Sequence, residues 1–586
     1  MLHTLVEYAE LYLPESEPGF KTREVRWCIE ISTADGFLGI IPLGDGMRGQ
    51  DQSRCPDMHG MNAGGKSHFL VETAQTITLL FKDKESEKTR TRVRARHKFF
   101  VELLSEASRQ TPVLAPLTRV LADESQLAEI KDALSEAKGK PADWIGWRVN
   151  GADLRCDQTV QQWWREWRRN DLGNSDSEEN KIGKGSDNEM ICILTGDSVK
   201  PLPTHPKITG LSGVGGLSMG DVMVGFDKAA FGSYGLDQSA NAAMSVDATQ
   251  KYVDALNDLI RNQSRKLGNL LVAHWFKEQI PLEHDPLAFI QELQSTEEAA
   301  ALGAAKRLLN SIRSGERADL GRNRFYALTL SGAAGRIMVR DWMEGGFEDL
   351  VRNVIAWFSD LAIVTRNGGG QALDPKFMAV CGALVRDLKE LPGPTVAALW
   401  KTAVQQLPVP RPFMAQALVR FRSDLVRDEP HNHARMGLIK AYFVRLQPGG
   451  DSTMTAYLNP DHPSAAYHCG RLLAVLANLQ RAALGDVGAG VVQRYYVAAS
   501  QTPGLILGRL TSNARNHLGK LETGLAYWYE SQIADVMSRL EDSAPRILDL
   551  EGQGLFALGY YQQLASLRAS NKNSKTESTT EKGETE

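Results

Sequence analysis

Cysteine is scarce in this sequence, and its positions give no sign of a metal site. Only six of the 586 residues are cysteines, and none of them forms a Cys-x-x-Cys pair. Structural zinc sites usually take their ligands from such pairs. We therefore expect no metal and no cofactor, and reduced thiols in a cytoplasmic setting. The cysteines are Cys28, Cys55, Cys156, Cys192, Cys381 and Cys469.

The sequence also lacks an excess of positive charge and any long hydrophobic run. Its formal net charge is −4, from 67 lysines and arginines against 71 acidic residues. Any contact with nucleic acid must therefore come from local basic patches. No run of about 18 apolar residues is present to cross a membrane, and the acidic N-terminal segment is not typical of a signal peptide. We expect no membrane partner.

The length and composition are those of an ordinary globular protein with roughly two to four domains. Hydrophobic residues make up 42% of the chain and charged residues 24%. We predict an α+β fold with a mixed N-terminal domain of β-hairpins and Gly-rich loops, a mainly helical middle and a C-terminal helical bundle. The predicted parts are residues 1–266, the middle region 267–446, a linker 447–463, the bundle 464–569 and a disordered tail 570–586.

Periodicity predicts the main elements of the N-terminal part. Apolar residues of Leu5–Leu13 recur at helical spacing, and Arg26–Ile31 with Gly36–Ile41 read as the strands of a hairpin. Phe99–Ala107 and Leu114–Ala137 read as helices, and Met190–Leu194 as a buried strand.

The remaining elements are mostly helical. The exception in the middle region is a strand over Arg324–Leu330, which a helix over Ala333–Met343 follows. Four amphipathic segments with short connections predict the bundle. They are Ser464–Ala483, Val487–Ser500, Gly504–Leu540, which is perhaps broken, and Gly552–Ala569.

Residues Gly60–Ser67 match the nucleotide-binding pattern Gly-x-x-x-x-Gly-Lys-Ser letter for letter. In a nucleoside triphosphatase this loop follows a buried strand, and its lysine reaches the outer phosphates. Here the preceding residues 49–59 are polar and include a proline, which argues against a buried parallel strand. The alternative is a Gly-rich loop that opens a helix at His68 and faces a DNA backbone or groove. Its candidate DNA-binding residues are Asn62, Gly64, Gly65 and Lys66.

A second candidate is the basic run Lys88–Lys98, which contains no acidic residue. On a strand its cations would share one face, whereas on a helix they would wrap around it. Either arrangement suits phosphate groups, and the alternative is a solvated face. The candidates for contact with a nucleic-acid backbone are Arg90, Arg92, Arg94, Arg96 and Lys98.

Tryptophans are concentrated in one segment, where Trp163, Trp164 and Trp167 stand close to several arginines. Aromatic rings interleaved with arginine can stack on bases. An apolar stripe of this kind is more often part of a core, and we favour the core.

The segment 204–260 holds eight glycines between Gly210 and Gly235 and then a helical pattern that starts after Ser245, a plausible N-cap. Glycine lets a backbone approach a ligand closely. The alternative is a long flexible hairpin followed by a helix. The candidate DNA-binding residues are Ser212, Gly215, Gly216, Ser218, Lys228, Gln238 and Asn241.

Further cations stand in the later part of the chain. Arg336 and Arg340 are suited to a nucleic-acid backbone or to a neighbouring subunit, or they are plain surface charge. Arg509, Arg515 and Lys520 give the bundle a basic stretch, to which Arg471, Arg481 and Arg494 add.

Several blocks in a fixed order cover most of the chain. They lie in 204–260, Phe325–Arg340, Gly470–Leu479, Gln501–Gly519 and Glu551–Tyr561. In the first block the matching positions are His205-Pro206, Gly210, Gly215-Gly216, Ser218, Phe226, Phe231–Gly235, Gln238, Asn241, Ser245, Tyr252 and Ala255–Asn257. Together these blocks resemble the large subunit of the type I-C CRISPR surveillance complex (Cascade).

The resemblance implies a protein that is not an enzyme. Such a subunit recognises a short motif beside the target, the PAM, on duplex DNA, aids strand separation, stabilises the R-loop and recruits a helicase–nuclease for antiviral defence. The implied partners are guide RNA (crRNA), target double-stranded DNA, the displaced strand, and the backbone and foot subunits of Cascade. A Gly-rich loop with Asn, Gln and Lys suits the minor groove, where acceptors distinguish A·T from G·C.

The resemblance also implies a small subunit made by internal translation of the same gene. An ATG start would fall at Met454, and a non-AUG start at Val487 or Val491 is the alternative.

Two functions of other classes stay open from the residues alone. One is a P-loop ATPase or nuclease acting on DNA, and the other is a scaffold whose Gly-rich loops only pack against a partner.

Overall fold

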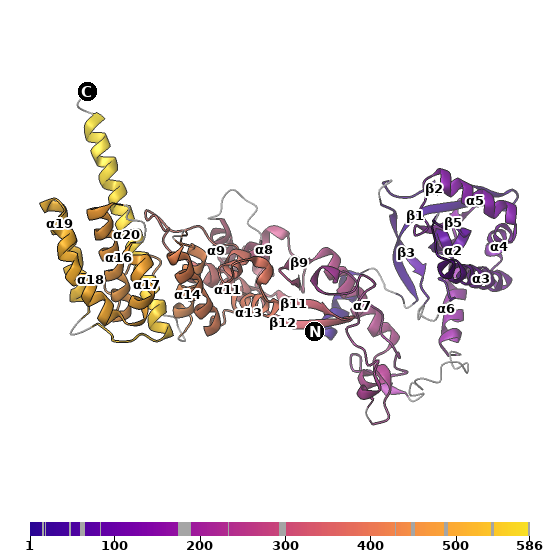
Figure 1. Cartoon of the computed structure of the whole chain (residues 1–586). Coiled ribbons are helices and arrows are strands. Elements are labelled where there is room, and N and C mark those ends of the chain that lie inside the picture. Colours follow the sequence, from indigo (N-terminus) through magenta and orange to yellow (C-terminus); the bar gives the residue numbers. More distant parts are fainter. Residues whose placement is uncertain are drawn as a thin grey trace. The chain divides into compact units, whose positions relative to one another are not determined.

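The computed structural model describes residues 1–586 except 14–16, 18, 46–47, 59–64, 83, 174–188, 233, 292–299, 428, 430, 447–451, 486–489, 541–543 and 584–586. The chain forms two compact units, drawn in Figure 1. The first unit holds Met1–Lys207 and Val224–Leu256, and the second holds Ile208–Met223 and Asn257–Glu586.

The first unit is built on a six-stranded sheet around β1 (Phe20–Ser32). β1 pairs antiparallel with β2 (Gly36–Pro42) and β3 (Gln50–Pro56), and parallel with β5 (Trp144–Val149). The short strands β4 (Glu72–Thr73) and β6 (Ala152–Asp153) also pair with β5. The predicted hairpin is therefore confirmed.

Helices pack on this sheet and form one core with it. The helices are α2 (Ala74–Thr78), α3 (Glu87–Gln110), α4 (Ala115–Ala122), α5 (Glu124–Glu136) and α6 (Gln158–Gly173). Trp163 and Trp164 of α6 are buried in that core, where their rings lie 5.0 and 5.3 Å from the ring of Phe69. The core alternative for these tryptophans is thus confirmed.

The first unit also contains α1 (Leu2–Tyr12), as predicted, and a small hairpin of β7 (Met190–Ile191) and β8 (Ser198–Val199). The prediction of a buried strand over Met190–Leu194 is wrong, because Ile191 and Ile193 are 64% and 59% exposed. A tight turn ends the strand early, since Gly196 N donates to Cys192 O and Cys192 N donates to Asp197 O.

The second unit begins with a four-stranded antiparallel sheet in the order β12-β11-β10-β9. Its strands are β9 (Ser264–Leu267), β10 (Leu270–Phe276), β11 (Arg324–Ala333) and β12 (Arg336–Gly346). α7 (Val246–Asn262) precedes the sheet, and Ser245 Oγ accepts from Ala248 N at its start, as the N-cap prediction requires.

The predicted helix over Ala333–Met343 is wrong, because this segment is the turn of a β-hairpin and most of strand β12. Ala334 and Gly335 both have positive φ, 49° and 88°, which is the backbone of a tight two-residue hairpin turn. Arg336 and Arg340 therefore lie on a strand. Their spacing of four residues fits a helix and a strand alike, and pairing with β11 decides between them.

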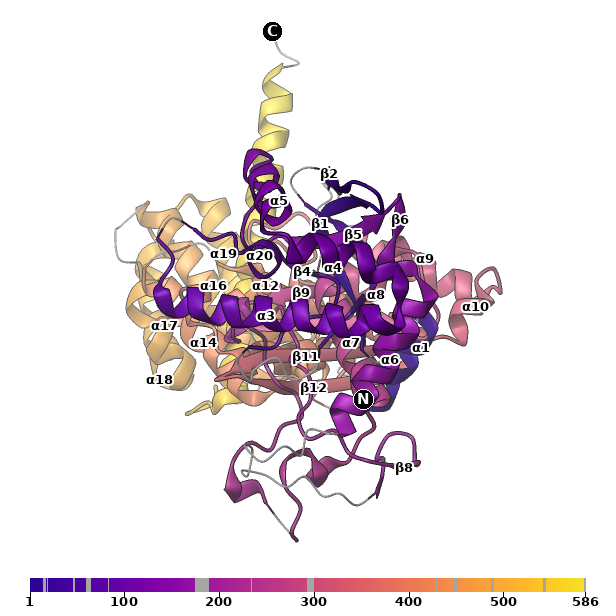
Figure 2. The ribbon, with the colours of Figure 1, turned by 90° about the vertical axis from the view of Figure 1, so that its right-hand side faces the viewer.

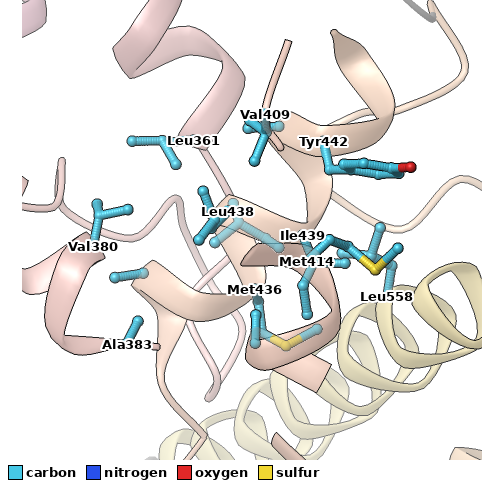
Figure 3. Close-up of a cluster of buried hydrophobic side chains, with 14 of the residues drawn as sticks. Leu361, Val380, Ala383, Val409, Met414, Met436, Leu438, Ile439, Tyr442 and Leu558 are labelled. Atoms are coloured by element: carbon cyan, nitrogen blue, oxygen red, sulfur yellow. The ribbon is translucent and has the colours of Figure 1, made fainter. Parts of the chain in front are cut away.

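The helices between β10 and β11, together with those that follow β12, bury a single large core. They are α8 (Pro286–Gln291), α9 (Ala300–Arg313), α10 (Ala318–Gly321), α11 (Phe347–Leu361), α12 (Phe377–Gly382), α13 (Gly393–Val404), α14 (Arg411–Val426) and α15 (His433–Val444). α15 is buried along its whole length from Ala434 to Phe443. In Figure 3, Leu438 and Ile439 of this helix lie among side chains of its neighbours.

The C-terminal helices form the predicted bundle, which Figure 1 shows as roughly parallel rods. They are α16 (Ala465–Leu484), α17 (Val491–Gln501), α18 (Pro503–Leu518), α19 (Thr523–Ser538) and α20 (Leu550–Gly583). Their buried residues belong to the same hydrophobic cluster as those of the middle helices.

Two segments of this region differ from simple expectation. The part of the predicted linker that the structure describes, residues 452–463, has no helix or strand but is held by hydrogen bonds. The segment from Ser570, predicted to be disordered, continues α20 as far as Gly583.

Two glycines allow α16 and α20 to cross at backbone contact. A Cβ on Gly470 would lie 2.0 Å from Phe556 O, and a Cβ on Gly559 would lie 2.0 Å from Tyr467 O. Beside the crossing, Tyr467 Oη donates to Gln562 Oε1 at 2.5 Å and Arg471 Nε donates to Gln563 Oε1 at 2.9 Å.

We predict that Gly470→Ala destabilises the second unit by about 1–3 kcal/mol or more, because the added methyl group meets a backbone oxygen that cannot move aside. Gly508→Ala is the matched control, since Gly508 also lies within a helix but nothing would lie within 4 Å of its Cβ. It should stabilise the chain by about 0.5–1 kcal/mol. Denaturant unfolding of the two variants measures both effects, and equal effects would contradict the crossing.

Candidate nucleic-acid interface

The basic run Lys88–Lys98 lies on the helix α3, which settles the choice between strand and helix. The helix begins after Ser86, whose Oγ accepts a hydrogen bond from Thr89 N at 3.3 Å. Val93 and Phe100 are buried, so the side of α3 that carries them faces the core. Figure 2 shows the helix along its length. Its exposed cations are Lys88, Arg92, Arg94 and Lys98, whereas Arg90 and Arg96 are half-buried.

The charge of this helix is only partly neutralised. Arg94 pairs with Glu87 at 3.2 Å and Lys98 with Glu102 at 3.9 Å, but both pairs are exposed and contribute little. Among the described residues, Lys88 and Arg92 have neither an ion-pair nor a hydrogen-bond partner. α3 thus presents a positive surface that α3's own acidic residues do not cancel.

The end of the first Gly-rich loop lies beside α3. Gly65 has a φ of +101°, and a Cβ on it would lie 3.9 Å from the Cβ of Ala95. Lys66 follows directly and is half-buried. The fold therefore brings the loop and the basic helix together, although Asn62 and Gly64 lie outside the described residues.

The expected helix at His68 is absent, and this part of the chain makes a tight turn instead. The backbone N–H of His68 donates to Glu72 Oε2 at 2.8 Å, and Leu70 has a φ of 62°. The next helix, α2, begins only at Ala74. Ser67 is fully buried. Both features differ from a P-loop, in which a helix N-terminus follows the lysine directly and the serine hydroxyl is accessible.

A compact polar cluster anchors the chain on both sides of this loop. Met58 N donates to His68 Nδ1 at 3.0 Å, and Arg23 pairs with Asp57 while its guanidinium lies 4.0 Å from the ring centre of Trp144. Burial, followed by the charge of Arg23, lowers the pKa of His68 below its usual range, so the ring is neutral and able to accept. These contacts hold Met58 and His68, the described residues on either side of the loop, close together.

The second Gly-rich loop uses its glycines for packing. Gly215 has a φ of +92°, and a Cβ on it would lie 2.8 Å from Gly332 O in β11. A Cβ on Gly332 would in turn lie 2.1 Å from the Cα of Gly216. Asp221, which is fully buried, accepts from Leu217 N at 3.1 and 3.2 Å. These glycines are explained by the close approach of two backbones.

The loop is bonded to the tip of the β11–β12 hairpin. Val222 N donates to Gly335 O at 2.9 Å, and Ile337 N donates to Val222 O at 3.0 Å. Ser212 and Ser218 of the loop are exposed, as is Arg336 of the hairpin. The structure thus joins these predicted residues in one surface region of the second unit.

Arg340 and Lys266 complete the description of this region. Arg340 is exposed, and its Nε donates to Ser331 Oγ at 2.9 Å. Lys266 of β9 was not predicted, yet its Nζ lies 3.8 Å from the Cβ position of Gly213. Its signal in the sequence is the pair Arg265-Lys266 directly after a helical pattern.

Three predicted residues of the same glycine-rich segment belong to the first unit. Asn241 Nδ2 donates to Leu236 O at 3.1 Å and to Gln238 O at 3.0 Å, so this amide braces its own loop. Gln238 has a left-handed backbone with φ 48°, and Lys228 is exposed.

The predicted cations of the bundle do not share one face of α18. Successive residues of a helix turn by about 100°, so Arg515 points away from Arg509, and Lys520 lies beyond the end of α18 at Leu518. All of them are exposed. Arg471 is buried and bonded to Gln563 and Asp535, which excludes it from a surface patch.

The chain matches the family model described as CRISPR-associated protein (Cas_Csd1) over residues 5–568 and therefore belongs to this family. No match was found among curated proteins. In the described part of the chain, no helix is both long and apolar enough to span a membrane. The expectation of a CRISPR-associated protein is confirmed at this level.

We predict that Lys88→Gln with Arg92→Gln weakens duplex DNA binding and lowers its salt dependence. Each lost phosphate contact should reduce the slope of log K against log salt by about 0.9. Binding over a salt series measures both quantities. The control is Lys131→Gln with Lys140→Gln, two exposed lysines elsewhere in the first unit. Equal loss in both double variants would show a general charge effect and remove α3 from the interface.

Proposed function

We propose that this chain is the large subunit of a type I-C CRISPR surveillance complex. In this proposal it is not an enzyme: it recognises the PAM on target duplex DNA, aids strand separation, stabilises the R-loop and recruits a helicase–nuclease. Its partners are guide RNA, target DNA, the displaced strand, and the backbone and foot subunits of the complex.

The observation that carries the proposal is the adjacency of a Gly-rich loop and a positively charged helix in the first unit. Gly65 packs at Ala95 of α3, and Lys66 stands next to that contact. Met58 and His68, on either side of the loop, are bonded to each other. A Gly-rich loop suits a shallow groove, where lysine adds charge and glycine lets the backbone come close. The cations of α3 would hold phosphates of the same duplex.

Contacts with the displaced strand and with guide RNA are assigned to other parts of the chain. Because base pairing with a guide carries most of the sequence information, the protein needs only a small motif reader and a positive track for strands. We assign the track for the displaced strand to Arg509 and Lys520 of the bundle. Arg336 and Arg340, on the exposed hairpin, are assigned to guide RNA or a neighbouring subunit.

The rival ATPase function is disfavoured by the local backbone. Ser67 is buried, and the chain after it turns instead of entering the helix whose N-terminus binds phosphate in a nucleotide site. The scaffold alternative is favoured only for Gly215 and Gly216, whose role in packing is explained above.

We predict that the assembled guide complex prefers duplexes with its PAM only when this chain is present, and that Lys66→Ala reduces that preference. Lys66 is the charged residue closest to the described end of the loop, so its loss should affect PAM-bearing duplexes more than others. Binding to matched duplexes that differ only in the flanking motif measures the preference.

The same Lys131→Gln, Lys140→Gln variant serves as control for this measurement. Motif preference that persists without the chain would assign PAM recognition to another subunit. Preference unchanged by Lys66→Ala, with the chain still required, would move the reader to other residues of the first unit.

Contacts of α20 support a start at Met454 for a small subunit over a start at Val487 or Val491. Gln562 of α20 donates to Thr455 O at 2.9 Å, and Tyr467 of α16 donates to Gln562. A product that begins at Met454 retains these contacts and the Gly470–Gly559 crossing. A product that begins at Val487 or Val491 lacks α16, the main partner of α20.

We therefore predict a product that spans residues 454–586. Mass analysis of all products of the gene should find it beside the full chain. Met454→Leu, encoded by a codon that does not start translation, should remove it while the full-length protein still folds, because leucine conserves the buried volume. A bundle-sized species that persists in this variant would contradict a start at Met454.

A further inference from the structure

A cavity of about 140 Å³ lies between α16, α17 and α18 in the C-terminal bundle. Polar groups of three helices line it, above the apolar side chains of Leu476 and Leu510. These groups belong to Gln480, Arg494, Tyr495, Asn513 and His517. None of the residues that line the cavity is acidic, so the cavity is suited to an anion.

Several hydrogen-bond donors of the cavity are unused. Among the residues that the structure describes, the guanidinium of Arg494 has no ion-pair or hydrogen-bond partner. His517 Nδ1 is buried and also lacks a partner within the described chain. A buried polar atom without a partner costs free energy, which a ligand atom would restore.

The side-chain carbonyl oxygen of Gln480, the one glutamine of the cavity wall, is already occupied, since it accepts from Val491 N at 2.8 Å. This bond lies at the N-terminus of α17, an 11-residue helix whose dipole is positive at that end. The cavity therefore offers donors and positive potential.

His517 contributes a hydrogen-bond donor to the cavity and no positive charge. Burial, followed by the charge of Lys520, lowers the pKa of His517 below its usual range. A neutral imidazole donates one hydrogen bond, so Arg494 supplies the full positive charge of the site.

A line of polar residues on α18 leads to the cavity. Arg509 and Asn513 are four residues apart on one side of α18, and Lys520 lies two residues beyond the end of the helix. Asn513 belongs both to this line and to the cavity wall. A strand that follows the line would bring one of its phosphates to the cavity mouth.

We propose that this cavity binds one phosphate group of the displaced DNA strand, held by the Arg494 guanidinium with Asn513 and His517. The inference rests on the proposed function of the bundle and specifies where one phosphodiester of the strand is fixed. The other source of the same chemistry is free phosphate.

The test uses the assembled guide complex with a target whose displaced strand carries one neutral methylphosphonate linkage, moved position by position. With the unmodified chain, we expect one linkage to weaken displaced-strand binding about tenfold more than its neighbours, the size of one hydrogen-bonded charge contact. With Arg494→Gln that distinct position should disappear, because the phosphate no longer has its partner. The matched control is Arg546→Gln, an exposed arginine at the opposite end of α18 beside Gly504 and Pro545.

The outcomes separate this site from the wider proposal. If Arg509→Gln with Lys520→Gln weakens strand binding but no single linkage stands out, the cavity assignment is wrong and the strand track survives. If displaced-strand binding is unchanged both in Arg494→Gln and in the Arg509→Gln, Lys520→Gln double variant, the cavity assignment and the strand track are both wrong. If inorganic phosphate raises the thermal stability of the full chain but not of Arg494→Gln, and no linkage stands out, the cavity takes free phosphate and the proposal is overturned.

Discussion

The close crossing of α16 and α20 is the constraint on which the second unit depends. Gly470 and Gly559 let the two backbones touch, and any side chain at either position would meet a carbonyl oxygen 2.0 Å away. Once the helices are at this separation, α20 becomes a support for other elements. Tyr561 of α20 donates to Val364 O at 2.9 Å, and Glu551 pairs with Arg411 of α14 at 2.7 Å. The cavity between α16, α17 and α18 has its shape because α16 is fixed in this way.

The same physical requirement explains the second Gly-rich loop. Gly215, Gly216 and Gly332 are placed where two segments of backbone approach each other, so their lack of a side chain serves packing. The first loop is different, because Gly65 has only one ordinary contact near its Cβ position, at Ala95. Two glycine-rich stretches that look alike in sequence therefore differ in packing, and Gly65 of the first lies beside the basic helix α3.

The distribution of charge follows from what each arginine meets in the fold. Arg435 pairs with Asp424, and Arg445 with Asp360, inside the core of the second unit, where losing one partner would leave a buried charge. Arg494 has no such partner in the described chain. Basic and acidic residues are nearly equal in number, but the arginines fall into two groups. One group forms ion pairs that hold helices together, and the other has no such partner among the described residues. Position along the chain does not separate them, since Arg471 and Arg494 stand in neighbouring helices of one bundle.

The sequence by itself determined the elements with clear periodicity: the β1–β2 hairpin, α7 after Ser245, and the helices of the bundle. It also determined the family, through glycine and polar blocks spread over most of the chain. It did not determine β12, because Arg336 and Arg340 fit a helix and a strand equally. It also did not show that the strand at Met190 ends early and is exposed. For the site, it indicated Lys66 and the basic run but not their adjacency, and it missed Lys266. Tertiary structure decided these points, because a local pattern fixes the period of a segment, whereas the partner of a strand, a glycine or an arginine comes from residues far away in the chain.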